Sequence, residues 1–460
     1  MGSAPAAEQT AASHPGFQRS ISGFHATLLV VGSVVGTGIL ATPALVRSSV
    51  PSVWLCLLLW ALGGLYAMAG ALSQARLAVR FPNAGGDYVY LRQCVGPLPA
   101  FLSGWISITL GFAGSAAALA RSAAQYAWPA LGAAAPSPTA EALAAILLLA
   151  AFTALNLRGV SASTRVQSAL TAFKVLALAA LAVTALLSSS YQASPHASSA
   201  QAPLAGAILA VIFTYTGWND SIYVAGEISS PSRNLPLSLI AGTAAVTALY
   251  ALFNFAYLTR SPAAVGSSDL AAATSLASSF LGPGATRAVA ALAATVILGC
   301  LAAVMVTGPR IAYAMAQDGM ALKALGRMSH RSVPSSAILF QSAVALAFVA
   351  AGSLQQIISW VAFAIVVFSG LATACVFHPL VRSANLQYRI PLYPWPPLIY
   401  VATSAALAVY VVVSDPKGAA GGAALVLAGC ALYPLAARSR KPASTTTLTS
   451  TPSDDRQIDP

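Results

Sequence analysis

The sequence predicts an all-α polytopic membrane protein with about 12 transmembrane helices, because its apolar runs have the roughly 20 residues that span a bilayer. Hydrophobic residues make up 57% of the 460 residues, and only 7% are charged. A soluble domain carries roughly 25% charged residues, so there are too few charges here to cover a soluble body. Composition therefore excludes a soluble enzyme, a nucleic-acid-binding protein and a disordered chain.

Pro, Gly and charged residues bound the apolar runs and mark the predicted spans in order. These spans are residues 21–47, 51–79, 97–129, 139–157, 163–188, 203–229, 234–260, 284–318, 335–352, 355–382, 394–413 and 419–437. Together they predict a transmembrane domain over residues 21–437. Residues 1–20 are predicted to be a cytoplasmic tail, and the Ser- and Thr-rich residues 438–460 a disordered cytoplasmic tail.

Positive charge is distributed unequally between the two ends of these spans. With both termini cytoplasmic, 17 Lys and Arg lie on the inner side and five on the outer side. Inner loops are enriched in Lys and Arg, so the net charge of +12 predicts orientation in a cell (plasma or inner) membrane. No loop is long enough for a nucleotide-binding domain and no GxxxxGK[ST] motif occurs, which excludes an ATP-driven pump.

The first and sixth spans are predicted to be discontinuous. Gly32, Gly36 and Gly38 fall in the middle of the first span, where each costs roughly 1 kcal/mol relative to Ala in a helix. The sixth span carries the polar run Thr214–Asp220. Close helix packing through small residues is the alternative for the glycines taken alone. The paired placement favours two broken helices, which mark a binding site between inverted repeats.

The repeat prediction divides the membrane domain into residues 21–188 and 203–382, five spans each, with two additional helices over 394–437. Gly217 lies ten residues before Glu227, or ~15 Å along a helix, which places it near the middle of the bilayer. A broken helix exposes free N–H groups at one half-helix start and free carbonyls at the other half's end. These groups attract a carboxylate and an ammonium, so the pattern favours a zwitterionic amino acid.

Five motifs in order resemble the amino acid–polyamine–organocation superfamily, and within it the prokaryotic relatives of the L-type amino acid transporters. They extend in order from the first to the eighth predicted span, and the count of twelve spans fits the rest of the chain. The motifs are Gly32-Ser-Val-Val-Gly-Thr-Gly-Ile-Leu-Ala-Thr-Pro43, Phe81-Pro-Asn-Ala-Gly-Gly-Asp-Tyr-Val-Tyr90, Phe213-Thr-Tyr-Thr-Gly-Trp-Asn219, Gly226-Glu-Ile-Ser-Ser-Pro-Ser-Arg-Asn-Leu-Pro236 and Gly308-Pro-Arg-Ile-Ala-Tyr-Ala-Met-Ala-Gln-Asp-Gly319.

The resemblance implies the fold of that superfamily, a five-plus-five inverted repeat, and assigns substrate-binding roles. It implies that backbone N–H groups of Gly36, Thr37 and Gly38 bind the substrate carboxylate. It implies that the carbonyls of Val34, Phe213 and Thr216 accept from the α-amino group. The Phe213 ring matches an aromatic gate, Asn219 matches a polar residue after the break, and Gly217 lies at the break itself.

Lys174 is the one cation deep within a predicted span, and an intramembrane charge is functional by default. The alternative is a lysine that extends toward the membrane surface from a helix end. In sodium-coupled relatives this region helps to hold sodium, whereas in the L-type-like branch a lysine here reaches toward the first helix. The resemblance thus implies sodium-independent transport, with Lys174 linking the first break to the fifth span.

Two acidic residues follow the second break. We expect Asp220 to be a structural partner rather than a site for a cationic substrate. Glu227 is predicted to pair with an inner-face arginine such as Arg92 or Arg233 in a gating network, with Arg310 and Asp318 in the same layer.

No disulfide-linked heavy chain is expected, because the loop at residues 128–140 has no Cys where eukaryotic L-type chains carry one. The five cysteines are scattered and suggest neither a metal site nor a disulfide framework. Dispersed histidines offer no catalytic cluster, so no enzyme activity, cofactor or metal is predicted.

The sequence therefore predicts a secondary active transporter of L-amino acids, with neutral ones favoured. It would work by alternating access, as an exchanger or a proton-coupled symporter. A cationic amino acid or polyamine carrier is the alternative within the fold. A non-transporting amino-acid sensor or a channel is the alternative from another class.

Overall fold

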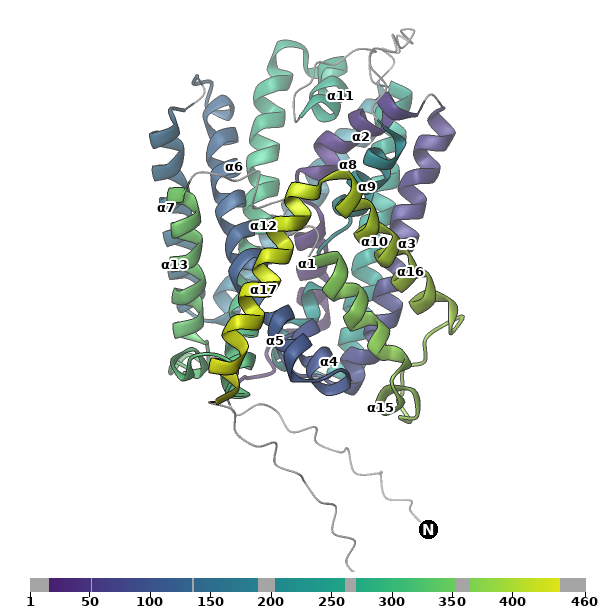
Figure 1. Cartoon of the computed structure of the whole chain (residues 1–460). Helices are drawn as coiled ribbons and strands as arrows, with labels where there is room; N and C mark the ends of the chain where they lie inside the picture. Colours follow the sequence, from purple (N-terminus) through teal and green to yellow (C-terminus); the bar gives the residue numbers. More distant parts are fainter. Residues whose placement is uncertain are drawn as a thin grey trace, which may run out of the picture.

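Helices account for nearly all regular structure in this computed structural model, which describes residues 16–50, 52–134, 136–188, 203–260, 270–351 and 365–438. Within these ranges, β pairing is confined to one isolated parallel bridge between Ile21 and Ile228. The helices lie side by side in a bundle, with α2 and α11 at one end and α4, α5 and α15 at the other (Figure 1).

The helices up to residue 187 are α1 (Gly23–Val34), α2 (Gly38–Ser49), α3 (Val53–Arg80), α4 (Asp87–Cys94), α5 (Pro97–Ile106), the π-helix η1 (Ser107–Gly114), α6 (Ser115–Ala130), α7 (Pro138–Leu157) and α8 (Val160–Leu187). The later α-helices are α9 (Leu204–Thr214), α10 (Pro231–Arg260), α11 (Ala271–Leu281), α12 (Ala285–Gln317), α13 (Ser335–Ala351), α15 (Pro379–Arg382), α16 (Trp395–Ser414) and α17 (Pro416–Arg438). An apolar helix over Ile365–Phe377 lies between α13 and α15. Short 3₁₀ turns are η2 (Asp220–Ile222), η3 (Ala225–Glu227), η4 (Gly282–Gly284), η5 (Lys323–Gly326) and η6 (Cys375–Phe377).

Eight helices of the described chain are long and apolar enough to cross a membrane, and the bent pair α1–α2 makes up to nine. Three shorter apolar helices, α9, α13 and Ile365–Phe377, fall within the predicted spans 203–229, 335–352 and 355–382. Residues 355–364 and the predicted tail after residue 438 lie outside the described residues, as do residues 1–15 of the predicted N-terminal tail. A multi-span helical protein is confirmed, and the number twelve stays a prediction.

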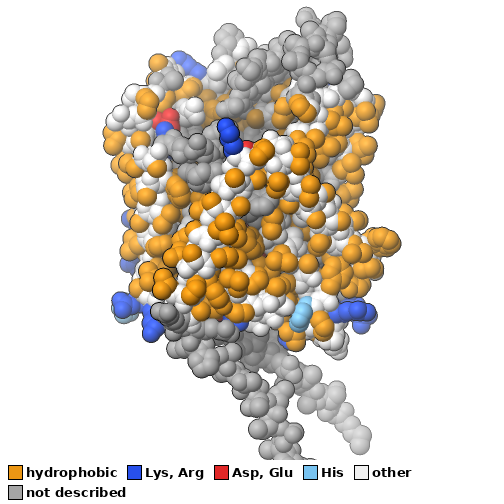
Figure 2. Space-filling view, viewed as in Figure 1, with side chains coloured by type: hydrophobic (Ala, Val, Ile, Leu, Met, Phe, Trp, Pro, Cys, Tyr) orange, Lys and Arg blue, Asp and Glu red, His pale blue; other side chains and the backbone are white. Residues whose placement is uncertain are grey.

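The outer surface of the bundle is apolar, as a lipid-facing protein requires. Leu147 on α7 and Leu427 on α17 are 70% and 68% exposed. Figure 2 shows hydrophobic side chains covering the visible face, with most visible Lys and Arg side chains toward its two ends. An exposed apolar face of this kind is stable in hydrocarbon and would be costly in water.

Helix α1 lies inside the bundle, where it packs against α8, α10 and α12. Small residues allow these close contacts: Gly242 of α10 lies against Val30 of α1, and Gly299 of α12 leaves room for the Lys174 side chain of α8. This packing places the end of α1 at the centre of the protein, surrounded by helices that are distant in sequence.

Candidate functional site

The first membrane segment is interrupted where the glycines predicted it. Helix α1 ends at Val34, α2 begins at Gly38, and the two are bent by 46°. Within the described chain, the N–H groups of Thr37, Gly38 and Ile39 make no backbone hydrogen bond. Gly36, Thr37 and Gly38 are partly exposed, although they lie between buried residues. The start of α2 therefore presents free donors at the positive end of its helix dipole.

The sixth segment is also interrupted, but in a different way from the first. Helix α9 ends at Thr214, and the chain then continues through turns and the 3₁₀ elements η2 and η3 until α10 begins at Pro231. The prediction of an interruption is confirmed, whereas a regular second half-helix is absent. Gly217 has φ +98°, a conformation that glycine adopts readily and other residues rarely do. Buried side chains of Asp220 and Ser221 also bond to other segments rather than to a local helix.

The two interruptions touch each other. A Cβ atom added to Gly217 would lie 3.0 Å from Cβ of Ser33 and 3.1 Å from its carbonyl carbon. Ser33 Oγ lies 2.5 Å from Asp220 Oδ2, a distance typical of a hydroxyl that donates to a carboxylate. On the other half of each segment, the hydroxyls of Thr42 and Thr214 are 3.0 Å apart. Two polar contacts and one close carbon contact thus join segments more than 170 residues apart in sequence.

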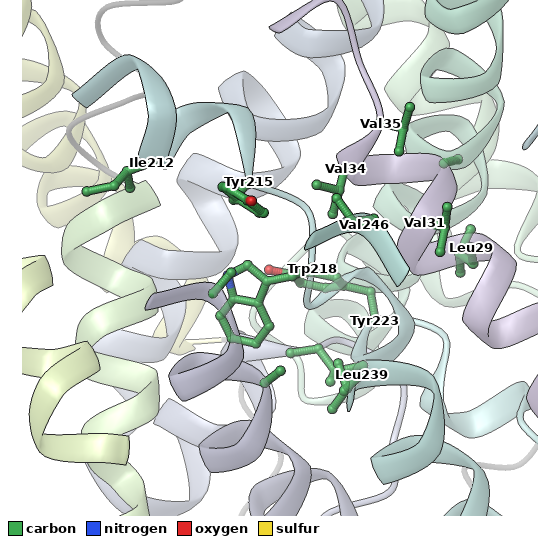
Figure 3. Packing of buried hydrophobic residues seen from close by; sticks show 14 of the residues in the cluster. Leu29, Val31, Val34, Val35, Ile212, Tyr215, Trp218, Tyr223, Leu239 and Val246 are labelled. Atoms are coloured by element: carbon green, nitrogen blue, oxygen red, sulfur yellow. The ribbon is translucent and has the colours of Figure 1, made fainter. Parts of the chain in front are cut away.

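Tyr250 of α10 also connects the two interruptions. Its hydroxyl lies 2.9 Å from the carbonyl oxygen of Val34 and 3.1 Å from that of Thr214, so it can donate to either. Figure 3 shows Val34 at the end of α1, on the side of the segment that carries Tyr215 and Trp218. The buried Tyr215 ring packs 5.0 Å from that of Tyr250. Sequence reasoning missed Tyr250, whose one signal is a hydroxyl within the apolar run of α10.

Lys174 reaches the first interruption from α8. Its Nζ donates to the carbonyls of Gly32 and Val35, each at 2.6 Å, and the side chain is fully buried. Cys300 Sγ of α12 lies 3.5 Å from Nζ and 3.3 Å from the Val35 carbonyl. No carboxylate forms an ion pair with Lys174 in the described chain. The ammonium therefore binds carbonyls at the end of α1, where the helix dipole is negative, and the alternative of a lysine extended to the membrane surface is wrong.

The predicted substrate-binding residues lie together around the two interruptions, but not all their carbonyls are free. The Phe213 carbonyl already accepts from the N–H and the hydroxyl of Thr216, at 3.0 and 2.7 Å. Thr216 is exposed, and Phe213, Gly217 and Asn219 are partly exposed. Exposed residues at this depth of an otherwise apolar bundle are consistent with a hydrated or ligand-accessible region.

The layer below the interruptions contains a buried ion pair that differs from the predicted one. Glu227 pairs with Arg310, at 2.7 Å from Nε and 3.1 Å from Nη2, and their side chains are 0% and 1% exposed. The expected partners, Arg92 and Arg233, are wrong. Arg92 Nε instead lies 3.8 Å from Asp318 Oδ2. Helix α12 packs so that its Arg310 lies beside Glu227, a contact that sequence spacing does not reveal.

Residues 16–22 cover this same layer. Ile21 N donates to the Glu227 carbonyl and Ser229 N to the Ile21 carbonyl, both at 2.9 Å. Phe17 packs edge-on against Tyr313 of α12 with ring centres 4.8 Å apart. The segment before α1 is thus attached to the chain just after the second interruption. No group of three or more His, Cys, Asp or Glu residues suited to a metal occurs in the described parts of the chain.

The chain is similar to known amino acid transporters over most of its length. The model of the family described as "Amino acid permease" matches residues 21–433. The human b(0,+)-type amino acid transporter 1 is 29% identical over 401 residues, covering 84% of this chain and 81% of that protein. The mouse protein of the same name is 27% identical over 412 residues, or 87% and 84%. The human large neutral amino acids transporter small subunit 2 is 29% identical over 429 residues, or 88% and 78%.

Proposed function

Because the chain belongs to the amino acid permease family, we propose that this multi-pass membrane protein carries neutral L-amino acids by alternating access, independently of sodium. The observation that carries the proposal is the contact between two interrupted membrane segments, at Ser33 with Gly217 and Asp220. Interrupted segments of this kind form midplane sites in secondary transporters. The relatives match this chain over most of their length, and their names specify amino acid transport. They therefore support the same functional class and argue against an enzyme.

In the proposed binding mode, the free N–H groups of Thr37 and Gly38 bind the substrate carboxylate at the start of α2. Carbonyls of Val34, Phe213 and Thr216 accept from the α-ammonium. Tyr250 lies against the Val34 carbonyl and Thr216 against that of Phe213. The Val34 carbonyl has a second lone pair that the ammonium can share, whereas at the Phe213 carbonyl, which already accepts two bonds from Thr216, the ammonium displaces an intramolecular donor. This exchange would couple substrate binding to a movement of α10 and of the second interruption.

Sodium independence is proposed from the position of the Lys174 ammonium. The ammonium lies between α8, α12 and the end of α1, and it binds the carbonyls that a sodium ion would otherwise need. A fixed cation there stabilises the partial negative charge at the end of α1. It also opposes entry of a second cation at short range. Net transport would then use exchange or a proton gradient.

The buried Glu227–Arg310 pair and the segment 16–22 are proposed to form a closed inner gate. Separating a buried pair leaves uncompensated charge, so we expect opening to require water entry around both side chains. Phe213 and Thr216 are more exposed than this ion pair, which supports our proposal that this conformation is closed toward the cytoplasm. Phe213 is the proposed gate above the substrate.

Several finer features belong to the same proposal. They are the twelve spans, the inverted repeats 21–188 and 203–382, the extra helices within 394–437, and cytoplasmic termini in a plasma or inner membrane. We also propose that the chain works without a disulfide-linked heavy chain. The support is the sequence position of its five cysteines, none of which lies between α6 and α7.

A carrier of cationic amino acids is the second candidate, and Asp220 is the observation that favours it. The carboxylate lies at the second interruption, is 6% exposed, and forms no ion pair among the described residues. Its short bond to Ser33 favours a structural role instead. A substrate panel separates the two candidates directly.

The test is uptake by purified protein in liposomes against labelled neutral, cationic and anionic amino acids and a polyamine. Each substrate is run with and without internal amino acid, sodium and a pH gradient. We expect uptake of neutral amino acids that survives the removal of sodium and is stimulated by internal substrate or by an inward proton gradient. Uptake confined to cationic substrates would replace the first candidate by the second. Loss of uptake on sodium removal would contradict the role of Lys174, and no uptake of any substrate would contradict transport.

A further inference from the structure

A cavity lies away from the interruptions, where the chain passes from the Ile365–Phe377 helix through α15 to α16. This cavity has a volume of about 460 Å³. Three arginines, Arg76, Arg382 and Arg389, line it together with Asn385 and Tyr393, and no Asp or Glu is among its lining residues. Its chemistry is therefore that of an anion site.

Arg76 of α3 fixes the wall of this cavity. Its Nη1 donates to the Tyr388 carbonyl at 2.9 Å, and its Nη2 lies 3.0 Å from the carbonyls of Val381 and Ala384. These bonds hold residues 381–388 against the end of α3. The loop that carries Arg382 and Arg389 is consequently preorganised, which lowers the entropic cost of ligand binding.

The other two arginines are free to bind a ligand. Arg382 and Arg389 are exposed, and neither belongs to an ion pair in the described part of the chain. An arginine guanidinium presents paired N–H donors that match the oxygens of a phosphate. Two such groups on one preorganised loop, without a competing carboxylate, favour a phosphate-bearing ligand.

Exposed apolar and aromatic residues flank the lining residue Tyr393 along the chain. Leu392 is 81% exposed, Tyr393 43% and Trp395 65%, and Leu398 and Ile399 extend this surface along the first turns of α16. Exposed Trp and Tyr beside an apolar helix face are typical of the membrane–water interface. In Figure 1, α15 lies at the same end of the bundle as α4, which is one of the two ends where Lys and Arg side chains are visible in Figure 2.

We propose that this cavity binds the headgroup of an anionic phospholipid. Arg382 and Arg389 hold the phosphate, and the acyl chains lie along Leu398 and Ile399 on α16. A soluble phosphate would satisfy the arginines but leave the exposed residues that flank Tyr393 unexplained, because contact with Leu392 and Trp395 contributes only for a ligand with hydrocarbon. The site is separate from the proposed substrate site, so its test does not depend on transport.

The experiment compares the full-length protein in nanodiscs of phosphatidylcholine alone and with added phosphatidylglycerol. The readouts are the thermal midpoint and the phosphatidylglycerol retained by the detergent-released protein in native mass spectrometry. The test variant is Arg382→Gln/Arg389→Gln. The matched control, Arg158→Gln/Arg331→Gln, removes two exposed arginines that lie on the same side in the proposed orientation.

We expect phosphatidylglycerol to raise the thermal midpoint of the unmodified protein and of the control. The test variant should bind it on the order of tenfold more weakly, since charge-assisted hydrogen bonds to the phosphate are lost. Trp395→Gln should weaken phosphatidylglycerol binding without changing any response to inorganic phosphate. Equal responses of test and control variants would overturn the proposal. An equal stabilisation by inorganic phosphate in phosphatidylcholine discs would also overturn it, in favour of a soluble anion.

Discussion

Ser33 Oγ lies 2.5 Å from Asp220 Oδ2, so the end of α1 is bonded directly to the interruption that follows α9. Both residues lie next to predicted substrate-binding positions, Val34 and Asn219. This short hydrogen bond joins the two interrupted segments, together with the contact between the Thr42 and Thr214 hydroxyls and the Tyr250 hydroxyl. Asp220 thus links the two segments through Ser33. This bond favours a structural role for Asp220 over recognition of a cationic substrate.

We expect Asp220→Asn to keep neutral amino acid uptake within a few-fold of the unmodified protein, because an amide can still accept from Ser33. Asp220→Ala should reduce uptake by about tenfold or more. A double-mutant cycle with Ser33→Ala should give a coupling energy of about 0.5–3 kcal/mol in thermal unfolding. Selective loss of cationic substrates in Asp220→Asn would show that the carboxylate recognises the substrate, and would contradict the structural role.

Replacing Lys174 by Met should abolish most transport. The methionine fills similar space but removes the ammonium that donates to the buried carbonyls of Gly32 and Val35. The single Cys300 thiol can then donate to only one of them, and an unsatisfied buried carbonyl costs about 1–3 kcal/mol. Uptake into liposomes should fall by an order of magnitude or more, and the thermal midpoint should fall as well. Lys323→Met, an exposed lysine of η5, is the control and should leave both unchanged. Full-rate uptake by Lys174→Met would remove Lys174 from the mechanism.

Gly217→Ala should be far more damaging than another Gly→Ala substitution in the same segment. At φ +98° an added Cβ is strained and lies 3.0 Å from Ser33, so we expect a loss of roughly 1–3 kcal/mol of stability and of most uptake. The control is Gly206→Ala in α9, where a Cβ meets no atom within 4 Å and helix propensity improves by about 1 kcal/mol. Similar effects of the two variants would show that the close contact of the interruptions is unimportant.

Two ion pairs of equal length provide a comparison of burial. Arg310–Glu227 and Arg121–Glu141 both have Nε–Oε1 distances of 2.7 Å, but the second pair is 16% and 20% exposed. Glu227→Gln should cost about 3–5 kcal/mol, because it leaves a buried arginine unpaired, whereas Glu141→Gln should cost about 1 kcal/mol or less. The thermal midpoints of the two variants, compared with that of the unmodified protein, measure both losses of stability. If Glu227 closes an inner gate, its variant should also increase the accessibility of inner-side cysteines such as Cys94 to thiol reagents.

Stability should fall as pH rises toward neutrality, because of Asp87 at the start of α4. Burial raises the pKa of this carboxyl to about 7, against the opposing hydrogen bonds from Tyr223 and Gln74. The folded state then holds a proton that the unfolded state has released, so stability present below the unfolded pKa of about 4 is lost as pH rises through about 7.

Asp87→Asn should therefore flatten the change in thermal midpoint between about pH 5 and pH 8 and raise the midpoint at the higher value. Asp415→Asn, at the start of α17 and outside this group, should retain the slope of the unmodified protein. An unchanged slope in Asp87→Asn would assign the pH dependence to other groups.

Periodicity and composition were sufficient for the features that depend on local chemistry. The apolar runs predicted a multi-span helical protein. The glycines around Gly36 and the polar residues around Gly217 predicted both interruptions, because backbone preference is a property of nearby residues. Lys174 was also found from sequence, since a charge within an apolar run is costly in a membrane and is therefore rare outside functional sites.

The tertiary structure alone decided which polar groups meet. Arg310 rather than Arg92 or Arg233 pairs with Glu227, Tyr250 connects the carbonyls of Val34 and Thr214, and turns follow Gly217 in place of a half-helix. The contacts of Arg310 and of Tyr250 join residues that packing brings together from segments distant in sequence. A membrane helix can rotate about its axis without changing its apolar pattern, so its sequence determines that it spans the bilayer but not which neighbour its few polar side chains face.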